Sequence, residues 1–230
     1  MKERIIVALD TDSPDAALAA VSSLAGEVGL FKVGMELFPR GGPDLIGRIL
    51  AKGADVFLDL KFHDIPNTVA GAVRSAVALG VKFATVHASG GKAMLAAAAS
   101  AAAGSGTTVL AVTVLTSLDD ADLASVGFAL PAAEAVDRLA GLAAEAGIGG
   151  IVCSAREVAA VRALVGKEVI LVTPGVRLPG DSSGDQKRVV TPFEAIRDGA
   201  NYIVVGRPIT KAADPVAAAR KFAAEVGRAL

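Results

Sequence analysis

The sequence predicts a single-domain α/β protein with the (β/α)8, or TIM-barrel, fold over residues 1–230. Short apolar runs rich in Val and Ile recur eight times, as is typical of parallel strands buried on both faces. Ala-rich amphipathic stretches separate these runs, and no linker or shift of composition divides the chain. The predicted strands are residues 5–10, 30–34, 56–61, 83–88, 108–115, 150–154, 169–175 and 202–206.

Helix-start signals lie between the apolar runs. Ser13 and Asp214 each precede a proline, which combines an N-cap residue with proline at the first helical position. The run from Thr191 to Glu194 has the form of a capping box, and residues 91–103 are dense in Ala, a strong helix former. An open doubly wound sheet is the main competing fold. It is disfavoured because no GxGxxG follows the first strand and because eight regular units favour closure.

Composition excludes several classes of protein. A hydrophobic content of 53% with 20% charged residues favours a packed core over disorder. The net charge of −1, with no long basic block, gives little support for binding nucleic acid or membrane surfaces. The apolar runs are too short for a membrane span or a signal peptide. The single cysteine, Cys153, allows no internal disulfide and fits a reducing compartment, so we expect a cytoplasmic protein.

Asp59 and Lys61 are the most informative polar residues. In a TIM barrel the chemistry takes place at the carboxyl ends of the strands, where this pair falls. Because the two residues are two apart on one strand, their side chains should point the same way, into the barrel. Burying an acid beside a base is costly even when they pair, and clustered ionisable groups in a cleft are typical of functional sites.

Other charged residues extend this pair along the barrel rim. Asp10 and Lys32 end the first two predicted strands, and adjacent strands are about 4.8 Å apart, so we expect charges of alternating sign at one mouth. Asp64 follows Lys61 by three residues, in a turn predicted from residues 65–67.

An anion site is predicted after the last two strands. Gly206 and Arg207 follow the eighth strand, where TIM barrels often bind phosphate. Glycine lets a backbone amide approach the anion, and arginine offers a planar fork of donors. Residues 178–190 are polar and rich in Gly, Ser and Asp, which is typical of a mobile lid, and Gln186 on this loop could reach the same anion.

The remaining chemically capable residues have structural interpretations. His63 alternates away from Asp59 and Lys61, which favours a packing or interface role. His87 ends the fourth strand, where a structural hydrogen bond is favoured although the rim position keeps a function open. Cys153 is expected to be a small buried apolar residue.

Taken together, these residues resemble the orotidine 5'-phosphate decarboxylase family over nearly the whole chain. The run DLKFHDIPNT at residues 59–68, with FKVG at 31–34 and VGR at 205–207, is highly specific. No family position departs from the pattern. Other matching segments are IVALD at 6–10, VHA at 86–88, LTS at 115–117, TPGVR at 173–177 and DQKR at 185–188.

The resemblance implies decarboxylation of orotidine 5'-phosphate to UMP, the last step of de novo pyrimidine nucleotide synthesis, with no cofactor and no metal. Lys61 would protonate the ring carbon after CO2 leaves, and Asp59 would lie beside the substrate carboxylate. Asp64 and Thr68 would enter the neighbouring subunit's site, which implies a homodimer with shared active sites. The other implied contacts are Asp10 and Lys32 to ribose, Thr116 to the base, and Arg177, Gln186, Gly206 and Arg207 to phosphate.

Two alternative functions remain open from the sequence. A metal-dependent sugar-phosphate decarboxylase or aldolase of the hexulose-phosphate synthase type shares DxKxxD, but it carries a Glu metal ligand where this chain has Lys32, whose charge repels a metal. A non-catalytic nucleotide-binding barrel would need the phosphate contacts but not a lysine flanked by aspartates. Loss of activity in EDTA would favour the first alternative. Binding of UMP without turnover of orotidine 5'-phosphate would favour the second.

Overall fold

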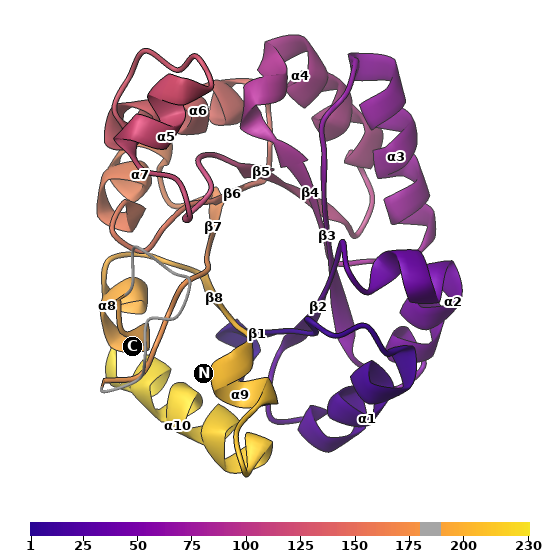
Figure 1. Ribbon diagram of the computed structural model, residues 1–230. Helices are drawn as coiled ribbons and strands as arrows, with labels where there is room; N and C mark the ends of the chain where they lie inside the picture. The colour runs from indigo at the N-terminus through magenta and orange to yellow at the C-terminus, as the bar shows by residue number, and fades with distance from the viewer. Residues whose placement is uncertain (180–189) are drawn as a thin grey trace.

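Eight parallel strands form a closed barrel in the computed structural model, which describes residues 1–179 and 190–230 (Figure 1). Each strand pairs with its neighbours in sequence, and the first strand pairs with the last. The predicted (β/α)8 fold is therefore confirmed. The strands are β1 Ile5–Ala8, β2 Leu30–Gly34, β3 Asp55–Phe62, β4 Phe83–His87, β5 Thr108–Val112, β6 Gly150–Val152, β7 Ile170–Thr173 and β8 Tyr202–Val205.

Helices surround the barrel on its outer side (Figure 1). The predicted caps are confirmed, since the side chains of Ser13, Thr191 and Asp214 accept hydrogen bonds from amides in the first helical turns. The α-helices are α1 Pro14–Leu24, α2 Phe38–Leu50, α3 Pro66–Ala78, α4 Gly91–Ala102, α5 Asp120–Ser125, α6 Ala132–Glu145, α7 Val158–Val165, α8 Pro192–Arg197, α9 Arg207–Thr210 and α10 Pro215–Arg228. Two short 3-10 helices, η1 Lys2–Arg4 and η2 Ala88–Gly90, complete the described elements.

Strand ends differ from the sequence prediction by a few residues. Most strands end earlier, so Asp10 lies in the loop just beyond β1 rather than on the strand, and Thr116 lies four residues beyond the end of β5. β3 differs in the other direction, because it starts at Asp55 and continues to Phe62. The predicted turn at residues 65–67 is wrong in part: α3 begins at Pro66, since proline without its N–H suits the first helical position.

The barrel interior is filled by apolar side chains on the amino-terminal side of the charged residues. The rings of Phe57 and Phe83 meet edge to face with centroids 5.9 Å apart, and Tyr202 meets Phe83 in the same way at 5.2 Å. Polar side chains on the interior faces of the strands therefore lie beyond this layer, at the carboxyl-terminal mouth of the barrel. The buried interior cluster comprises Ile6, Ala8, Leu30, Phe57, Phe83, Leu110, Val172 and Val204.

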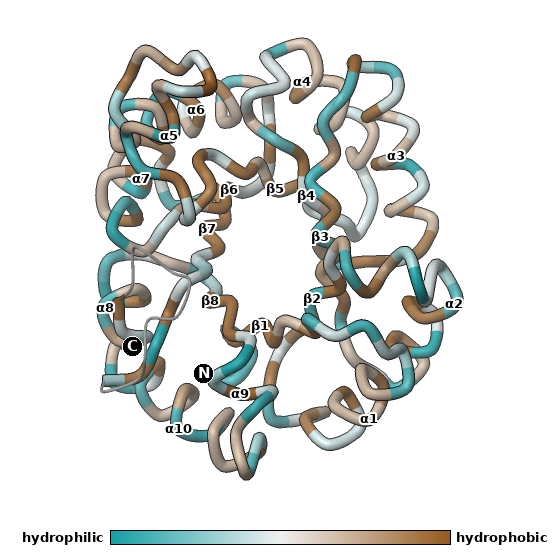
Figure 2. The backbone as a smooth tube through the Cα atoms, viewed as in Figure 1, coloured by the Kyte–Doolittle hydropathy of each residue, from teal (hydrophilic) through white to brown (hydrophobic). Residues whose placement is uncertain are grey.

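A second and larger apolar layer lies between the strands and the helices. Figure 2 shows the strands mainly in hydrophobic colours, whereas the helices alternate between hydrophobic and hydrophilic positions. This pattern is expected when each helix covers the barrel with one face and meets water with the other. Among the described residues, no helix has the length and apolar character needed to cross a membrane.

Candidate active site

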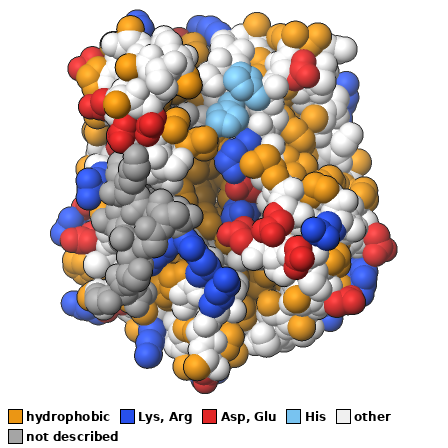
Figure 3. All heavy atoms as spheres, viewed as in Figure 1, with side chains coloured by type: hydrophobic (Ala, Val, Ile, Leu, Met, Phe, Trp, Pro, Cys, Tyr) orange, Lys and Arg blue, Asp and Glu red, His pale blue; other side chains and the backbone are white. Residues whose placement is uncertain are grey.

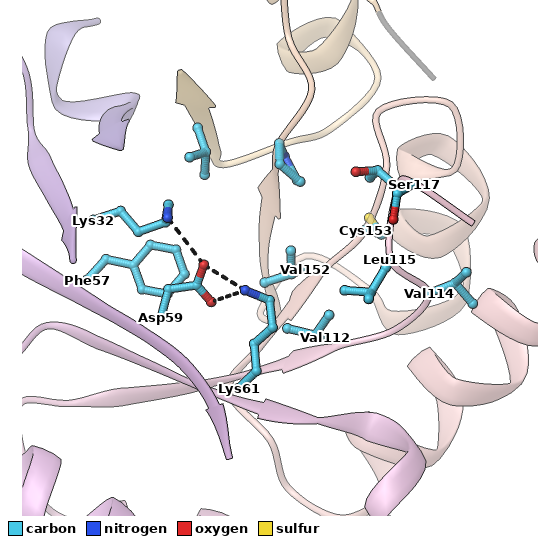
Figure 4. Close-up of a pocket in the computed structure, with 13 residues that line it drawn as sticks. Lys32, Phe57, Asp59, Lys61, Val112, Val114, Leu115, Ser117, Val152 and Cys153 are labelled. Atoms are coloured by element: carbon cyan, nitrogen blue, oxygen red, sulfur yellow. Dashed lines mark hydrogen bonds and ion pairs between the residues drawn. The ribbon is translucent and has the colours of Figure 1, made fainter. Parts of the chain in front are cut away.

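Lys61 and Asp59 form a close ion pair at the carboxyl-terminal mouth (Figure 4). The Lys61 ammonium donates to both carboxylate oxygens of Asp59, with Nζ 2.9 Å from Oδ1 and 2.9 Å from Oδ2. The side chains are 22% and 12% exposed, respectively, so the pair is largely shielded from water. Because water is largely excluded, the attraction between the two charges is stronger than at a protein surface. Lys61 also lines a cavity.

Two further residues extend the pair into a row of alternating charge. The Nζ atom of Lys32 on β2 lies 3.5 Å from Oδ2 of Asp59 and 3.1 Å from Oδ1 of Asp10. The prediction that these four side chains meet at one rim is therefore confirmed. The order runs from Asp10 through Lys32 and Asp59 to Lys61, so that each inner charge lies between charges of opposite sign.

The backbone at Lys61 is unusual. Its φ of 52° makes it the one residue other than glycine with a positive φ among the described residues. A left-handed backbone costs an L-residue about 1 kcal/mol or more, so surrounding contacts must maintain it. Regular alternation along β3, from which the sequence predicted the common direction of Asp59 and Lys61, is interrupted here.

The electrostatics of the site favour an ionised Asp59. Burial opposes the charged form, but the ammonium groups of Lys32 and Lys61 outweigh burial, together with hydrogen bonds from Lys61 and Thr85, and hold the pKa of Asp59 below its usual value. The site therefore keeps a carboxylate rather than a carboxylic acid next to the lysine at neutral pH.

Lys32, Asp59 and Lys61 of this row form one wall of a cavity of about 350 Å³. The opposite wall is mainly apolar, and the loop after β5 adds Thr116 and Ser117. Charged groups on one side and apolar walls on the other suit a planar ligand that carries a negative charge at one edge. The apolar lining comes from Phe57, Val112, Val114, Leu115, Val152, Cys153, Pro174 and Val204.

A second cavity of about 380 Å³ adjoins the first and shares Lys32, Pro174 and Val204 with it. Its far end is cationic, with Arg177 and Arg207 on the loops after β7 and β8. Figure 3 shows the mouth as a hollow with basic side chains beside it. This is the position at which TIM barrels commonly bind phosphate. The other lining residues are Ala8, Asp10, Gly175, Gly206 and Lys211.

Most of the predicted site residues therefore line one continuous region, but Asp64 and Thr68 do not. Both are exposed, Asp64 in the bend after β3 and Thr68 in the first turn of α3. The Asp64 carboxylate accepts a hydrogen bond from the Ile65 amide at 2.6 Å. Within residues 1–179 and 190–230, no ion pair joins Asp64 to Lys61. Gln186 and most of the predicted 178–190 lid lie outside the described residues.

The two histidines lie beside the site rather than in it. The rings of His63 and His87 are 5.4 Å apart with a tilt of 39°, and Figure 3 shows them together next to the mouth. Burial, reinforced by the neighbouring His63 and Lys61, lowers the pKa of His87. Cys153 is buried, as expected, and burial raises the pKa of its thiol, so it contributes an apolar contact to the cavity rather than a nucleophile.

Two residues of this region were not predicted from the sequence. Thr85 on β4 is fully buried and hydrogen-bonded to Asp59, and the alternation of Phe83, Thr85 and His87 along the strand could have placed it on the interior face. Lys211 lines the cationic cavity one helical turn after Arg207, and that spacing was the available signal.

A closed eight-stranded barrel with ionisable residues gathered at its carboxyl-terminal mouth defines the class of TIM-barrel enzymes. Within this class the chain belongs to the orotidine 5'-phosphate decarboxylase / HUMPS family, whose model matches residues 3–222.

Individual relatives agree with this assignment. A protein of Anaeromyxobacter sp. (strain K) named orotidine 5'-phosphate decarboxylase is 58% identical over 222 residues, which cover 96% of this chain and 97% of that protein. One of the same name from Moorella thermoacetica is 52% identical over 233 residues, covering 98% and 92%. The crystal structure of orotidine 5'-phosphate decarboxylase from Lactobacillus acidophilus superposes with a TM-score of 0.86 at 40% identity, covering 96% of this chain and 97% of that one.

Proposed function

We propose that this chain removes CO2 from orotidine 5'-phosphate to give UMP, the last step of de novo pyrimidine nucleotide synthesis, and that Lys61 is the proton donor. The observation that carries the proposal is the Lys61 ammonium, held 2.9 Å from both Asp59 oxygens at the wall of the 350 Å³ cavity. Loss of CO2 leaves an electron pair on a ring carbon. A fixed cation in a partly dry site stabilises that developing charge and can then deliver the proton.

Asp59 has two roles in this mechanism. Its carboxylate holds the Lys61 ammonium in place before the reaction, so the cation needs no reorganisation when the ring carbon becomes negative. It also lies at the cavity wall where the substrate carboxylate must fit. Repulsion between the two carboxylates then favours departure of CO2, and the neighbouring Lys32 limits the cost of bringing them together.

The phosphate end contributes binding energy rather than chemistry. Arg177, Gly206 and Arg207 would hold the phosphate in the second cavity, while Asp10 and Lys32 would contact the ribose between the two cavities. Thr116 would contact the base from the loop after β5. Binding energy obtained far from the reacting carbon can be used to place the ring against Lys61. Gln186 is proposed as a further phosphate ligand.

The metal-dependent sugar-phosphate alternative is disfavoured by Lys32. Its ammonium occupies the space between Asp10 and Asp59, at 3.1 and 3.5 Å, and would repel a divalent cation bound by these carboxylates. Over residues 1–179 and 190–230, no three His, Cys, Asp or Glu side chains lie close enough to form a metal-binding group. A purely binding role is disfavoured because nucleotide binding alone gives no reason to bury Lys61 against Asp59.

The quaternary structure we propose is a homodimer in which Asp64 and Thr68 complete the partner's site. Two large apolar side chains that follow strands at the same mouth are exposed, Met35 at 59% and Ile65 at 67%. Exposed large apolar side chains are buried when a partner covers them. We also propose a cytoplasmic location, which fits the free, buried Cys153.

A spectrophotometric assay with orotidine 5'-phosphate, run with EDTA present, tests the function directly. We expect the wild-type chain to be active, and Lys61→Ala to remain folded but lose turnover by several orders of magnitude. Lys82→Ala is a matched control, because it also removes a lysine paired with an aspartate of β3. Lys82 lies 2.8 Å from Asp55, which is at the end of β3 opposite to Lys61. Near-parental turnover in folded Lys61→Ala, or loss of wild-type activity on chelation, would refute the proposal.

A further inference from the structure

The strand pair β3–β4 is irregular at the site. Leu58 pairs with Ala84, but the next pair joins Phe62 to Val86, so β3 advances four residues where β4 advances two. The extra length bulges at Asp59, Leu60 and Lys61, opposite Thr85. Bulges next to active sites commonly redirect a side chain, and this one contains the left-handed backbone of Lys61.

Thr85 fills the space opposite the bulge with two hydrogen bonds. The Lys61 backbone amide donates to the Thr85 hydroxyl oxygen at 2.8 Å, and the hydroxyl lies 3.0 Å from Oδ1 of Asp59. Because an ionised carboxylate can only accept, the single hydroxyl proton must point to Asp59 while a lone pair receives the Lys61 amide. Thr85 is fully buried, so water does not compete for either bond.

These bonds complete the surroundings of the Asp59 carboxylate. Its Oδ1 accepts from Lys61 Nζ and from Thr85, while its Oδ2 accepts from Lys61 Nζ and faces Lys32 Nζ at 3.5 Å. Each oxygen therefore has two partners, and the carboxylate has no free direction in which to rotate. Loss of the Thr85 bond would leave Oδ1 with Lys61 alone and would leave the Lys61 amide without an acceptor.

We propose that Thr85 is a positioning residue for decarboxylation, which locks the Asp59 carboxylate and the backbone of Lys61 into a single geometry through one hydroxyl group. The inference rests on the proposed function of Lys61 and Asp59. The lock acts at both ends of the catalytic pair: it prevents rotation of the carboxylate, and it replaces the strand hydrogen bond that the Lys61 amide loses in the bulge. The Lys61 ammonium then meets the ring carbon from one fixed direction.

Threonine has two properties that the position requires. A branched side chain suits the crowded barrel interior, and the hydroxyl donates and accepts at the same time. Valine keeps nearly the same shape without the hydroxyl, whereas serine keeps the hydroxyl and loses a methyl group. The pair of substitutions therefore separates the hydrogen bonds from packing.

The test measures kcat, KM and their pH dependence for Thr85→Val and Thr85→Ser. Hydrogen bonds to charged groups are stronger than those between neutral groups, so their loss should displace the catalytic pair. We expect Thr85→Val to lower kcat about 10- to 100-fold. KM should change much less, because the phosphate and ribose contacts are intact. Thr85→Ser should stay within about threefold of wild type, since it retains both bonds.

The pH dependence of kcat distinguishes loss of the hydrogen bond from loss of packing, because a change of packing alone would leave it unchanged. Removing a donor to the carboxylate should shift the acidic limb of Thr85→Val to higher pH. The charged groups facing Asp59 are Lys61 on its own strand and Lys32 on β2, and the titratable His87 on β4 also interacts with it electrostatically. All three are retained in the variant. Amide hydrogen exchange at Lys61 should also become faster without its acceptor.

Thr107→Val is the matched control. Thr107 is also buried, and its hydroxyl donates to the Val81 carbonyl oxygen outside both cavities. It should lose stability while keeping the wild-type pH profile and kcat. If Thr85→Val does not fold, Thr85→Ala should show the same shift of the acidic limb.

Three outcomes are decisive. A Thr85→Val protein with wild-type kcat and acidic limb overturns the inference, as does a Thr85→Ser protein as impaired as Thr85→Val. If the wild-type chain itself lacks decarboxylase activity, the proposed function fails instead. Titration of the Asp59 carboxyl and amide exchange at Lys61 in the free protein then still decide whether Thr85 holds this geometry.

Discussion

Lys61 combines several features of the site that are unfavourable for an isolated residue. Its side chain is largely shielded, its charge is held against a carboxylate, and its backbone adopts a conformation that L-residues avoid. Two of these features are stabilised by different neighbours: Asp59 pairs with the charge, and Thr85 accepts from the backbone amide. Strain of this kind persists only where surrounding contacts determine the conformation, which fits a residue selected for its direction.

His87 provides a residue-scale prediction about pH. Its pKa is lowered in the folded protein, chiefly by burial, so between this lowered value and the usual 6.5 the unfolded chain binds the proton more readily. This contribution to stability is complete above about pH 6.5 and is lost as the pH falls toward the lowered folded pKa. We expect His87→Gln to flatten that dependence. Urea denaturation at several pH values measures it, and an unchanged slope in the variant would contradict the assignment.

At the scale of elements, β3 and its neighbours carry the site because the barrel places polar residues only beyond a packed apolar layer. Phe57 precedes Asp59 on the interior face of β3, and Phe83 precedes Thr85 on that of β4. The apolar rings exclude water from below, and the charged groups project above them. Alternation along the strands places Phe57 and Asp59 on the interior face, and the bulge after Asp59 then directs Lys61 to the same mouth.

β6 is short and closely packed, which leads to a prediction about Gly150. A Cβ atom added there would collide with the Leu110 side chain and lie 2.8 Å from the Ile170 carbonyl oxygen. We expect Gly150→Ala to lower the free energy of unfolding by about 1–3 kcal/mol, because neighbouring strands cannot move apart freely.

Gly47 in α2 is the control, because it is exposed and a Cβ there meets nothing within 4 Å. Gly47→Ala should raise the free energy of unfolding by about 0.4–1 kcal/mol, through the lower entropy of the unfolded chain. Denaturant unfolding of the two variants measures both effects. If the two midpoints shift in the same direction, this explanation is wrong.

At the scale of the whole molecule, the barrel gathers two adjoining cavities from loops distant in sequence. The first is lined by Asp59 and Lys61, and the second is lined by Arg177 and Arg207. Their shared residues, Lys32, Pro174 and Val204, come from three different strands or strand ends. One extended substrate with a ring at one end and a phosphate at the other matches this arrangement.

The proposed shared active sites predict complementation between two inactive variants. Lys61→Ala and Asp64→Ala homodimers should each be nearly inactive. A mixed dimer contains one intact site only if Asp64 acts across the interface, because wild-type Lys61 then meets wild-type Asp64 from the partner. Unfolding and refolding an equimolar mixture should restore about a quarter of wild-type activity, given random pairing of subunits. Absence of any recovery, with dimers present by ultracentrifugation, would exclude action in trans.

The sequence by itself determined the barrel and most of the residues at the mouth, because these follow from periodicity and short-range spacing, and its motifs carried the resemblance to the family. Eight apolar runs specify eight buried parallel strands, and the place of Asp59 and Lys61 near the end of the third run puts both at the carboxyl-terminal mouth. The helix caps at Ser13, Thr191 and Asp214 were readable for the same reason. Such features need only the local chain and the solvent preferences of its side chains.

Only the tertiary structure decided the bulge at residues 59–61, the positive φ of Lys61, the hydrogen bonds of Thr85 and the place of Lys211 in the second cavity. Each depends on how one strand or helix is positioned against another, and the register between neighbours is not written in either segment alone. Thr85 illustrates the reason. It is 26 residues from Asp59 in the chain, and its importance arises only when β4 pairs with an irregular β3.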